Sequence, residues 1–286
     1  MANTIILAKK FLPVIDKIYK KESVTSILDT PTQQGNLDFS GVNTVNIMKV
    51  STTGLGDYSK ENGYAQGNAT LEWEAMTLKE DRSAALTVDR MDNEETLGQA
   101  FGVIMNEFIR TNVAPEVDAY RFAKYAKTAD IGTAAAALAD GEAVVKAVRA
   151  AITAMDEAEV PAEDRILFIT PTLKGLVEDL DTTKSKEVFK RFYAVVEVPQ
   201  TRFYTDITLN SGADAWGFTK GAGAKDINFV AVSKSAVVQA TKMALPKVFD
   251  PDTNQTKDAW LFQYRLYHDC FAYENKVSGI YVHTKA

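Results

Sequence analysis

Apolar and polar residues alternate with a period of two over much of residues 42–89. The alternation starts at Val45 and Ile47 and returns at Leu71 and Trp73, a pattern typical of half-buried β-strands. A glycine-rich stretch separates the two runs, and its glycines are Gly54, Gly56, Gly63 and Gly67. We predict a long β-hairpin with a flexible tip, because the Gly-x-Gly pair lacks the lysine and the following helix of a phosphate-binding loop.

Two segments that flank the hairpin follow a helical period instead. The apolar spacing in residues 1–28 predicts an N-terminal arm whose helix either caps the body or reaches onto another subunit. A second helix starts with a capping box at Asp92, and its apolar stripe continues to residue 127. Pro115 falls inside this helix, so we expect a kink or break near residues 112–114.

The rest of the chain divides into an α/β part and a β-rich end. Within residues 128–245 we predict helices near 145–155 and 171–180 and strands near 165–170, 195–199 and 228–233. Residues 236–240 fit either a short helix or a strand. Residues 246–286 predict two strands, at 259–273 and 277–283, and the first is aromatic enough to be packed on both faces.

A two-stranded hairpin is at best marginally stable in water, so the predicted one needs a further surface to cover one face. Its charge is −2, from five basic and seven acidic residues, whereas five lysines and two acids give the arm +3. Opposite charges steer docking and fix register, so we expect arm and hairpin to meet across subunit boundaries. The expected interface residues are Lys9, Lys10, Phe11, Lys17, Lys20, Lys21, Tyr58, Lys60, Glu61, Tyr64, Glu72, Trp73, Glu74 and Lys79.

Composition limits the other functions open to the chain. Its 286 residues are 46% hydrophobic, enough for one large domain or two ordinary ones. A single cysteine, Cys270, excludes an internal disulfide framework and a multi-thiolate metal site. No apolar stretch reaches the ~20 residues that cross a bilayer, and no signal-peptide pattern opens the chain. A net charge of −6 argues against a domain built to grip phosphates.

The sequence predicts no active site. Cys270 and His268 lie two residues apart and would share one face of a strand, so a nucleophile–base pair is geometrically possible. The aromatic residues around them favour a packed thiol instead. His268 and Asp269 are too few ligands for zinc, and the acidic pairs of the chain lie in polar segments. We therefore expect no catalytic residue, metal or cofactor.

Several short segments carry a resemblance to a known family. Residues 115–124 (PEVDAYRFAK), 195–203 (VVEVPQTRF), 249–254, 258–262 and 264–269 resemble, in this order, a spine-helix segment, the strand after the axial helices and the closing strands of that family. The family is that of tailed-bacteriophage major capsid proteins with the Hong Kong 97-type fold. The resemblance implies an α+β fold with an N-arm (1–41), an E-loop hairpin (42–91), a peripheral domain with the spine helix (92–127), an axial domain (128–245) and returning peripheral strands (246–286).

The resemblance also implies a function. Such proteins are structural: they self-assemble through hexamers and pentamers into an icosahedral shell around phage DNA, are made in the host cytoplasm and reside in the virion. The implied partners are other copies of the chain, packaged double-stranded DNA in weak contact, and separate portal and decoration proteins. No scaffold-like region precedes the arm, which points to a separate scaffold protein or none, and no asparagine partner for a cross-link to Lys60 or Lys79 is evident.

Two alternatives stay open at this point. An encapsulin-like bacterial compartment shell would have the same fold and would enclose protein cargo. A soluble α/β enzyme is the rival from a different class, and the scarcity of His and Cys argues against it.

Overall fold

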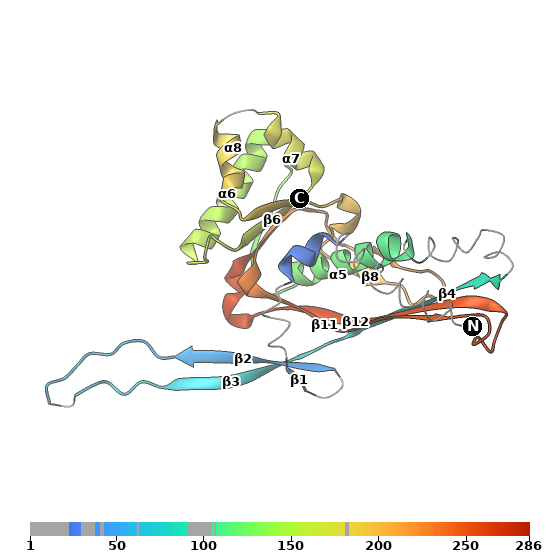
Figure 1. Cartoon of the computed structure of the whole chain (residues 1–286). Helices are drawn as coiled ribbons and strands as arrows, with labels where there is room; N and C mark the ends of the chain where they lie inside the picture. The colour runs from blue at the N-terminus through green and yellow to red at the C-terminus, as the bar shows by residue number, and fades with distance from the viewer. Residues whose placement is uncertain are drawn as a thin grey trace.

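The chain folds into a projecting hairpin, a long three-stranded sheet and an α/β unit that lies to one side of that sheet (Figure 1). The computed structural model describes residues 23–29, 38–40, 43–61, 63–90, 105, 107–180 and 183–286. Most of the predicted N-terminal arm, and the first turns of the helix predicted from residue 92, therefore lie outside the described residues.

The hairpin consists of β2 (Thr44–Thr52) and β3 (Ala69–Thr77), which pair antiparallel in one continuous register. β1 (Asp38–Ser40) pairs with the start of β2 as a third strand. The predicted hairpin with a glycine-rich tip is confirmed, but it is shorter than expected. β4 (Glu80–Asp89), which we expected within the hairpin, pairs with a strand of another sheet. The alternation continues through both strands, so it does not mark where the chain changes sheet.

The long sheet has the antiparallel order β11-β12-β4, with β11 spanning Val237–Phe249 and β12 spanning Ala259–Ala272. The aromatic strand predicted near residues 259–273 is confirmed as β12. Phe262, Tyr264 and Leu266 on one face of β12 are buried with apolar residues of the neighbouring helix. We expected the other face of β12 to be packed as well, but Gln263 and Arg265 are exposed there.

The irregularity expected at Pro115 takes the form of a change in helix type. Residues Ile109–Val113 form the π-helical segment η2, and α5 (Ala114–Ala126) follows with Pro115 in its first turn. The backbone is helical at the junction, at Val113 and Ala114. Proline removes one backbone donor, and the wider π turn before it lets the chain continue without a break.

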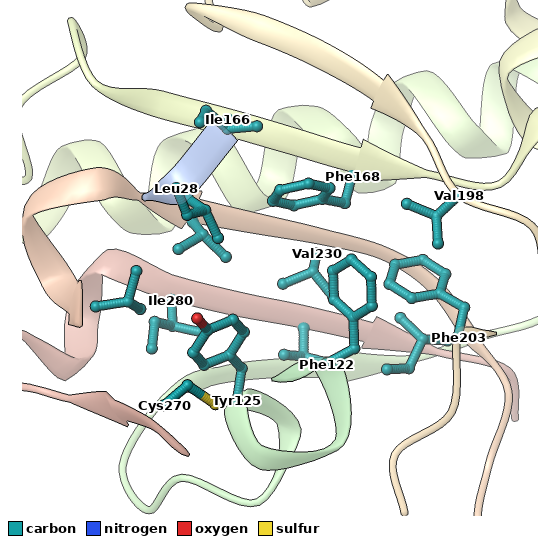
Figure 2. Close-up of a cluster of buried hydrophobic side chains, with 14 of the residues drawn as sticks. Leu28, Phe122, Tyr125, Ile166, Phe168, Val198, Phe203, Val230, Cys270 and Ile280 are labelled. Atoms are coloured by element: carbon teal, nitrogen blue, oxygen red, sulfur yellow. The ribbon is translucent and has the colours of Figure 1, made fainter. Parts of the chain in front are cut away.

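A five-stranded mixed sheet is the middle layer of the α/β unit, in the order β5-β13-β10-β6-β7. Its strands are β5 (Gly132–Ala135), β6 (Arg165–Ile169), β7 (Ala194–Glu197), β10 (Ile227–Ser233) and β13 (Ile280–Thr284). One face packs against α6 (Gly141–Glu157), α7 (Pro171–Glu178) and α8 (Thr183–Lys190). The other packs against α5 and the short η1 (Val24–Leu28), in the core that Figure 2 shows.

The C-terminal segment is shared between the two larger sheets. We expected residues 246–286 to return wholly to the peripheral part, but β13 lies between β5 and β10 in the α/β unit. β11 also crosses the expected boundary at residue 245 as one strand, and residues 236–240 are the end of η4 (Lys234–Ala236) and the start of β11. Partners that are distant in sequence decide these positions, and local periodicity does not encode them.

Smaller elements connect these layers: η3 (Gln200–Arg202), the hairpin of β8 (Ile207–Leu209) and β9 (Phe218–Lys220), and η5 (Glu274–Gly279). Arg82 of β4 fixes the β8–β9 loop. Its Nη1 donates to the Asn210 carbonyl at 2.8 Å, and its Nε donates to the Glu116 carboxylate of α5 at 2.6 Å. The loop that carries Trp216 is therefore held beside β4.

The aromatic core of the α/β unit yields the first prediction. The Phe122 ring is fully buried, with its centroid 5.2 Å from that of Phe168 and 4.7 Å from that of Phe203. Phe122→Ala leaves a cavity and should lower the free energy of unfolding by about 3–5 kcal/mol in urea denaturation of the unassembled chain. Tyr193→Ala, at a residue that is 65% exposed, is the control and should change it by about 0.5 kcal/mol or less. Equal losses for the two variants would contradict the assignment of this core.

Candidate assembly surface

The pairing of β2 with β3 gives the hairpin two different faces, because residues opposite each other in an antiparallel register share a face. On one face, Val45 and Met76 are buried in a cluster with residues of β11. On the other, Val50 is 55% exposed, Leu71 61% and Trp73 62%. We call these three residues the hairpin apolar face. The sequence predicted the alternation, and the structure shows which face is covered and that Trp73 lies on the exposed one.

The tip of the hairpin carries two exposed tyrosines. Tyr58 and Tyr64 are 64% and 85% exposed, and their ring centroids lie 5.3 Å apart in an edge-to-face arrangement. An antiparallel bridge between Ser59 and Gly63 closes the turn between them, and Gly63 has the positive φ of 75° that glycine adopts at low cost. The tip therefore presents paired aromatic rings to its surroundings.

Contacts on both strands fix the base of the hairpin. Lys49 Nζ lies 2.6 Å from the Glu274 carboxylate, and this hydrogen bond raises the pKa of Lys49. The Leu78 amide donates to the Asn43 carbonyl at 2.8 Å, and the Tyr267 hydroxyl donates to the Leu78 carbonyl at 3.1 Å. These bonds set the direction in which the hairpin leaves the long sheet.

Asp269 of β12 is the buried centre of this junction. Its carboxylate is fully buried and accepts from the Tyr120 hydroxyl at 2.8 Å, the Cys270 amide at 2.8 Å and the Lys79 amide at 3.2 Å, with Lys124 Nζ at 3.3 Å. Burial, together with this carboxylate, raises the pKa of Tyr120, so the phenol remains a donor. One side chain thus joins the exit of the hairpin, β12 and α5.

A second buried carboxylate, Asp118 of α5, holds residues 23–25, which belong to the predicted arm. It accepts from the hydroxyls of Ser23 and Thr25, both at 2.7 Å, and from the amides of Val24 and Thr25, both at 3.1 Å. Arg202 Nη1 adds a bond at 3.2 Å from η3. Five donors on one buried carboxylate fix the position of η1 on α5.

The predicted interface residues fall into three groups. The arm residues Lys9, Lys10, Phe11, Lys17, Lys20 and Lys21 lie outside the described residues, so the expected contact between arm and hairpin stays a prediction. Tyr58, Lys60, Glu61 and Tyr64 lie together at the exposed tip. On β3, Glu72 and Trp73 are exposed, while burial, followed by Glu274, raises the pKa of the half-buried Glu74. The side chain of Lys79 is exposed at the junction between β3 and β4.

Sequence reasoning missed the residues that anchor the hairpin. Glu274, Tyr267 and Asp269 come from the far end of the chain, and no local pattern ties them to residues 43–79. A polar residue flanked by aromatic residues within a strand, as Asp269 is, was the one available signal of a buried carboxylate.

The candidate pair of Cys270 and His268 has no nucleophilic character. Cys270 is fully buried, and burial, together with Asp269, raises the pKa of its thiol to about 12. His268 is 3% exposed and packs edge-on against the Tyr120 ring, with 5.5 Å between ring centroids. Among the described residues, no group of three His, Cys, Asp or Glu side chains is placed to bind a metal ion, and no helix is long and apolar enough to cross a bilayer.

No protein-family model and no curated protein matches this chain. Solved structures match it over nearly its whole length. A chain of the structure titled "Mycobacterium phage Che8" is 14% identical with a TM-score of 0.61, covering 90% of this chain and 89% of that one. A chain of the cyanophage P-SCSP1u capsid structure is 15% identical with a TM-score of 0.60, covering 87% and 85%. A chain of the virus-like particle from Pyrococcus furiosus is 9% identical with a TM-score of 0.55, covering 93% and 98%.

These matches confirm the fold expected from the sequence: the chain has the α+β fold of the Hong Kong 97-type capsid proteins.

Removal of the Asp269 carboxylate should weaken both stability and the junction. Asp269→Ala leaves buried donors unpaired and should cost about 3–5 kcal/mol of unfolding free energy, and the amides of Leu78 and Lys79 should exchange hydrogen faster. Asp81→Ala removes the exposed ion pair with Arg265 and, as the control, should cost about 0–1 kcal/mol. Unchanged exchange at Leu78 and Lys79 in Asp269→Ala would contradict the proposed anchoring.

His268 makes stability depend on pH. Burial, and then the positive charges of Arg121 and Arg82, lower its pKa to about 3, against the ordinary 6.5 of the unfolded chain. As pH falls from about 6.5 towards 3, only the unfolded chain takes up this proton, so stability falls by about 1.4 kcal/mol per pH unit from this group. His268→Phe keeps an aromatic ring without a titratable nitrogen and should remove this part of the slope in urea denaturation at pH 7, 6 and 5. The same slope in both proteins would show that His268 is not the group.

Proposed function

We propose that this chain is the major capsid protein of a tailed bacteriophage, which self-assembles through hexamers and pentamers into an icosahedral shell around phage DNA. The fold supports this proposal, and so do the titles of the similar structures, two of which name phages. In this reading the hairpin is the E-loop, η2 and α5 are the spine helix, the α/β unit is the axial domain, and the long sheet belongs to the peripheral domain.

The observation that carries the proposal is the uncovered hairpin apolar face. Val50, Leu71 and Trp73 are each more than half exposed, on a hairpin that projects from the rest of the chain (Figure 1). Large apolar side chains gain free energy when water is removed from them, about 25 cal/mol per Å² buried. A neighbouring copy that covers this face would supply the packing surface that a two-stranded hairpin needs.

The charge of the chain supports a weak contact with the enclosed DNA. A net charge of −6 gives the wall no overall attraction for phosphate groups, which dominate the affinity of proteins for nucleic acids. Packaged double-stranded DNA would therefore lie against the wall without tight binding, and a scaffold, portal or decoration protein would attach through other surfaces. The arm lysines would meet the acidic hairpin of a neighbouring copy.

A second candidate is a compartment shell that encloses protein cargo. The likeness to the Pyrococcus furiosus virus-like particle favours it, because that match covers 93% of this chain and 98% of that one. Both candidates require a closed shell, and they differ in the contents.

Negative-stain microscopy and size-exclusion chromatography of the purified chain test the shell. We expect closed particles or ring-shaped capsomers, and nuclease-protected DNA in particles from infected cells. Protected protein cargo without DNA would favour the compartment. A small oligomer at high protein concentration, with an enzymatic activity, would contradict both candidates.

Deletion of residues 53–68 tests the role of the hairpin tip. The strands β2 and β3 lie outside this segment, so the helix content measured by circular dichroism should stay unchanged, while closed particles should be lost. Exchange of the same residues for a glycine–serine linker of equal length serves as the control for chain length and should also lose particles. Particles of normal diameter from either variant would contradict the role of the tip.

A further inference from the structure

The five-stranded sheet of the α/β unit has one edge at which four of its strands end. β6 and β13 both run antiparallel to β10, β5 runs parallel to β13, and β7 runs parallel to β6. The carboxyl ends of β5, β6, β7 and β13 therefore meet at the same edge of the sheet. In open α/β sheets, ligands bind in the crevice outside the carboxyl ends of the strands.

A cavity of about 440 Å³ lies at this edge. Its lining comes from the segments that follow the four strands and from the start of β10, namely residues 137–139, 170–173, 200, 228 and 285–286, together with Leu176 of α7. The C mark in Figure 1, below α7, shows its place in the fold. The volume falls within the range of small-ligand sites, about 300–1,000 Å³. We call this cavity the sheet-edge crevice.

The start of α7 presents hydrogen-bond donors to the crevice. The amides of the first helical turn have no acceptor within a helix, and in α7 they belong to Thr172 and Leu173, since Pro171 has no N–H group. The N-cap residue Thr170 makes no capping bond with its side chain. Thr170 is only 5% exposed and lines the crevice, and its hydroxyl has no hydrogen-bond partner among the described residues. A buried hydroxyl of this kind indicates an acceptor that this part of the chain does not supply.

Two amide side chains supply acceptors to the same crevice. Asn228 is 2% exposed, and its Nδ2 donates to the carbonyls of Ala136 and Thr284, both at 3.1 Å. Gln200 Nε2 donates to a main-chain carbonyl at 2.8 Å. These bonds fix the orientation of both amides, and neither side-chain oxygen accepts a bond from a residue that the structure describes. The crevice can therefore bind N–H groups as well as an oxyanion.

The rest of the lining is apolar and comes mainly from three leucines, Leu138, Leu173 and Leu176. At the rim, Lys285 Nζ lies 3.2 Å from the Asp226 carboxylate, which also pairs with Lys220 at 2.7 Å. Two cations thus share one carboxylate, and no acidic side chain lines the crevice. This balance, together with the positive end of the α7 dipole, favours a ligand with a single negative charge.

We infer that the sheet-edge crevice binds the C-terminal residue of a polypeptide that ends in an apolar side chain. The free carboxylate accepts from the Thr170 hydroxyl and the first amides of α7, and the N–H group of the same residue donates to Asn228 or Gln200. The apolar side chain lies along the leucines. A free amino acid fits less well, because its ammonium group would be buried without an acidic side chain to pair with it. The inference does not rest on the proposed function, since one chain supplies every residue of the crevice.

Saturation-transfer NMR with N-acetyl-L-leucine tests the inference on the full chain. This probe carries one carboxylate, one N–H group and one apolar side chain, and the method measures weak binding to free subunits and to particles alike. We expect a Kd of about 1 mM, in keeping with a ligand of about twelve heavy atoms. N-acetyl-L-leucinamide, which lacks the carboxylate, and N-acetylglycine, which lacks the apolar side chain, should each bind at least about tenfold more weakly. Equal affinity for these probes, no binding of N-acetyl-L-leucine, or tighter binding of free L-leucine would overturn the inference.

Substitutions at Thr170 locate the binding in the crevice. Thr170→Val removes the hydroxyl and should raise the Kd about tenfold, whereas Thr170→Ser keeps the hydroxyl and should keep the wild-type Kd. Since no described residue bonds to this hydroxyl, Thr170→Val should not lower the free energy of unfolding, which separates lost binding from lost folding. Thr219→Val, at an exposed threonine of β9, is the matched control and should leave the Kd unchanged. An unchanged Kd in Thr170→Val would overturn the inference.

Discussion

A hairpin one sheet thick has no interior, and this constraint shapes the whole molecule. At its base, β2 and β3 pack against β11, and Val45 and Met76 are buried there. Further out, none of the residues that the structure describes covers the opposite face, and Val50, Leu71 and Trp73 are exposed. The described part of the chain therefore leaves an apolar surface exposed, and the proposed assembly would cover it. The buried carboxylates that anchor the base of the hairpin are best understood from this condition.

The anchors matter because a projecting element magnifies small errors in direction. A hairpin that reaches a neighbour must leave its own body at a defined angle. Asp269 joins its exit to α5 and β12, and Lys49 joins its other strand to Glu274. Asp118 of α5 fixes the position of η1 by accepting hydrogen bonds from the Thr25 amide and from Arg202. Buried carboxylates suit this task, since a shifted backbone would leave charged oxygens without donors.

The sequence allowed the local elements to be predicted, but it did not reveal which sheet each strand joins. The alternation in residues 44–77 and the apolar stripe of α6 report burial on one face, and the structure confirms both. β4 and β13 show the limit, because a strand looks the same whether it continues a hairpin or pairs with a strand far away. The sequence also could not predict that the hairpin apolar face is exposed, since exposure depends on which residues lie opposite in space. The overall order of parts was predicted from the resemblance of segments such as residues 115–124 to a known family. Periodicity alone did not predict it.

Sequence identities of 14% and 15% beside TM-scores of 0.61 and 0.60 fit the same constraint. In a ring of identical copies each contact is repeated by symmetry, so every pair needs only a modest free energy and no single side chain is indispensable. What must persist is the geometry: a projecting strand pair and a body that holds it in place. Side chains at a contact can then change together while the fold remains.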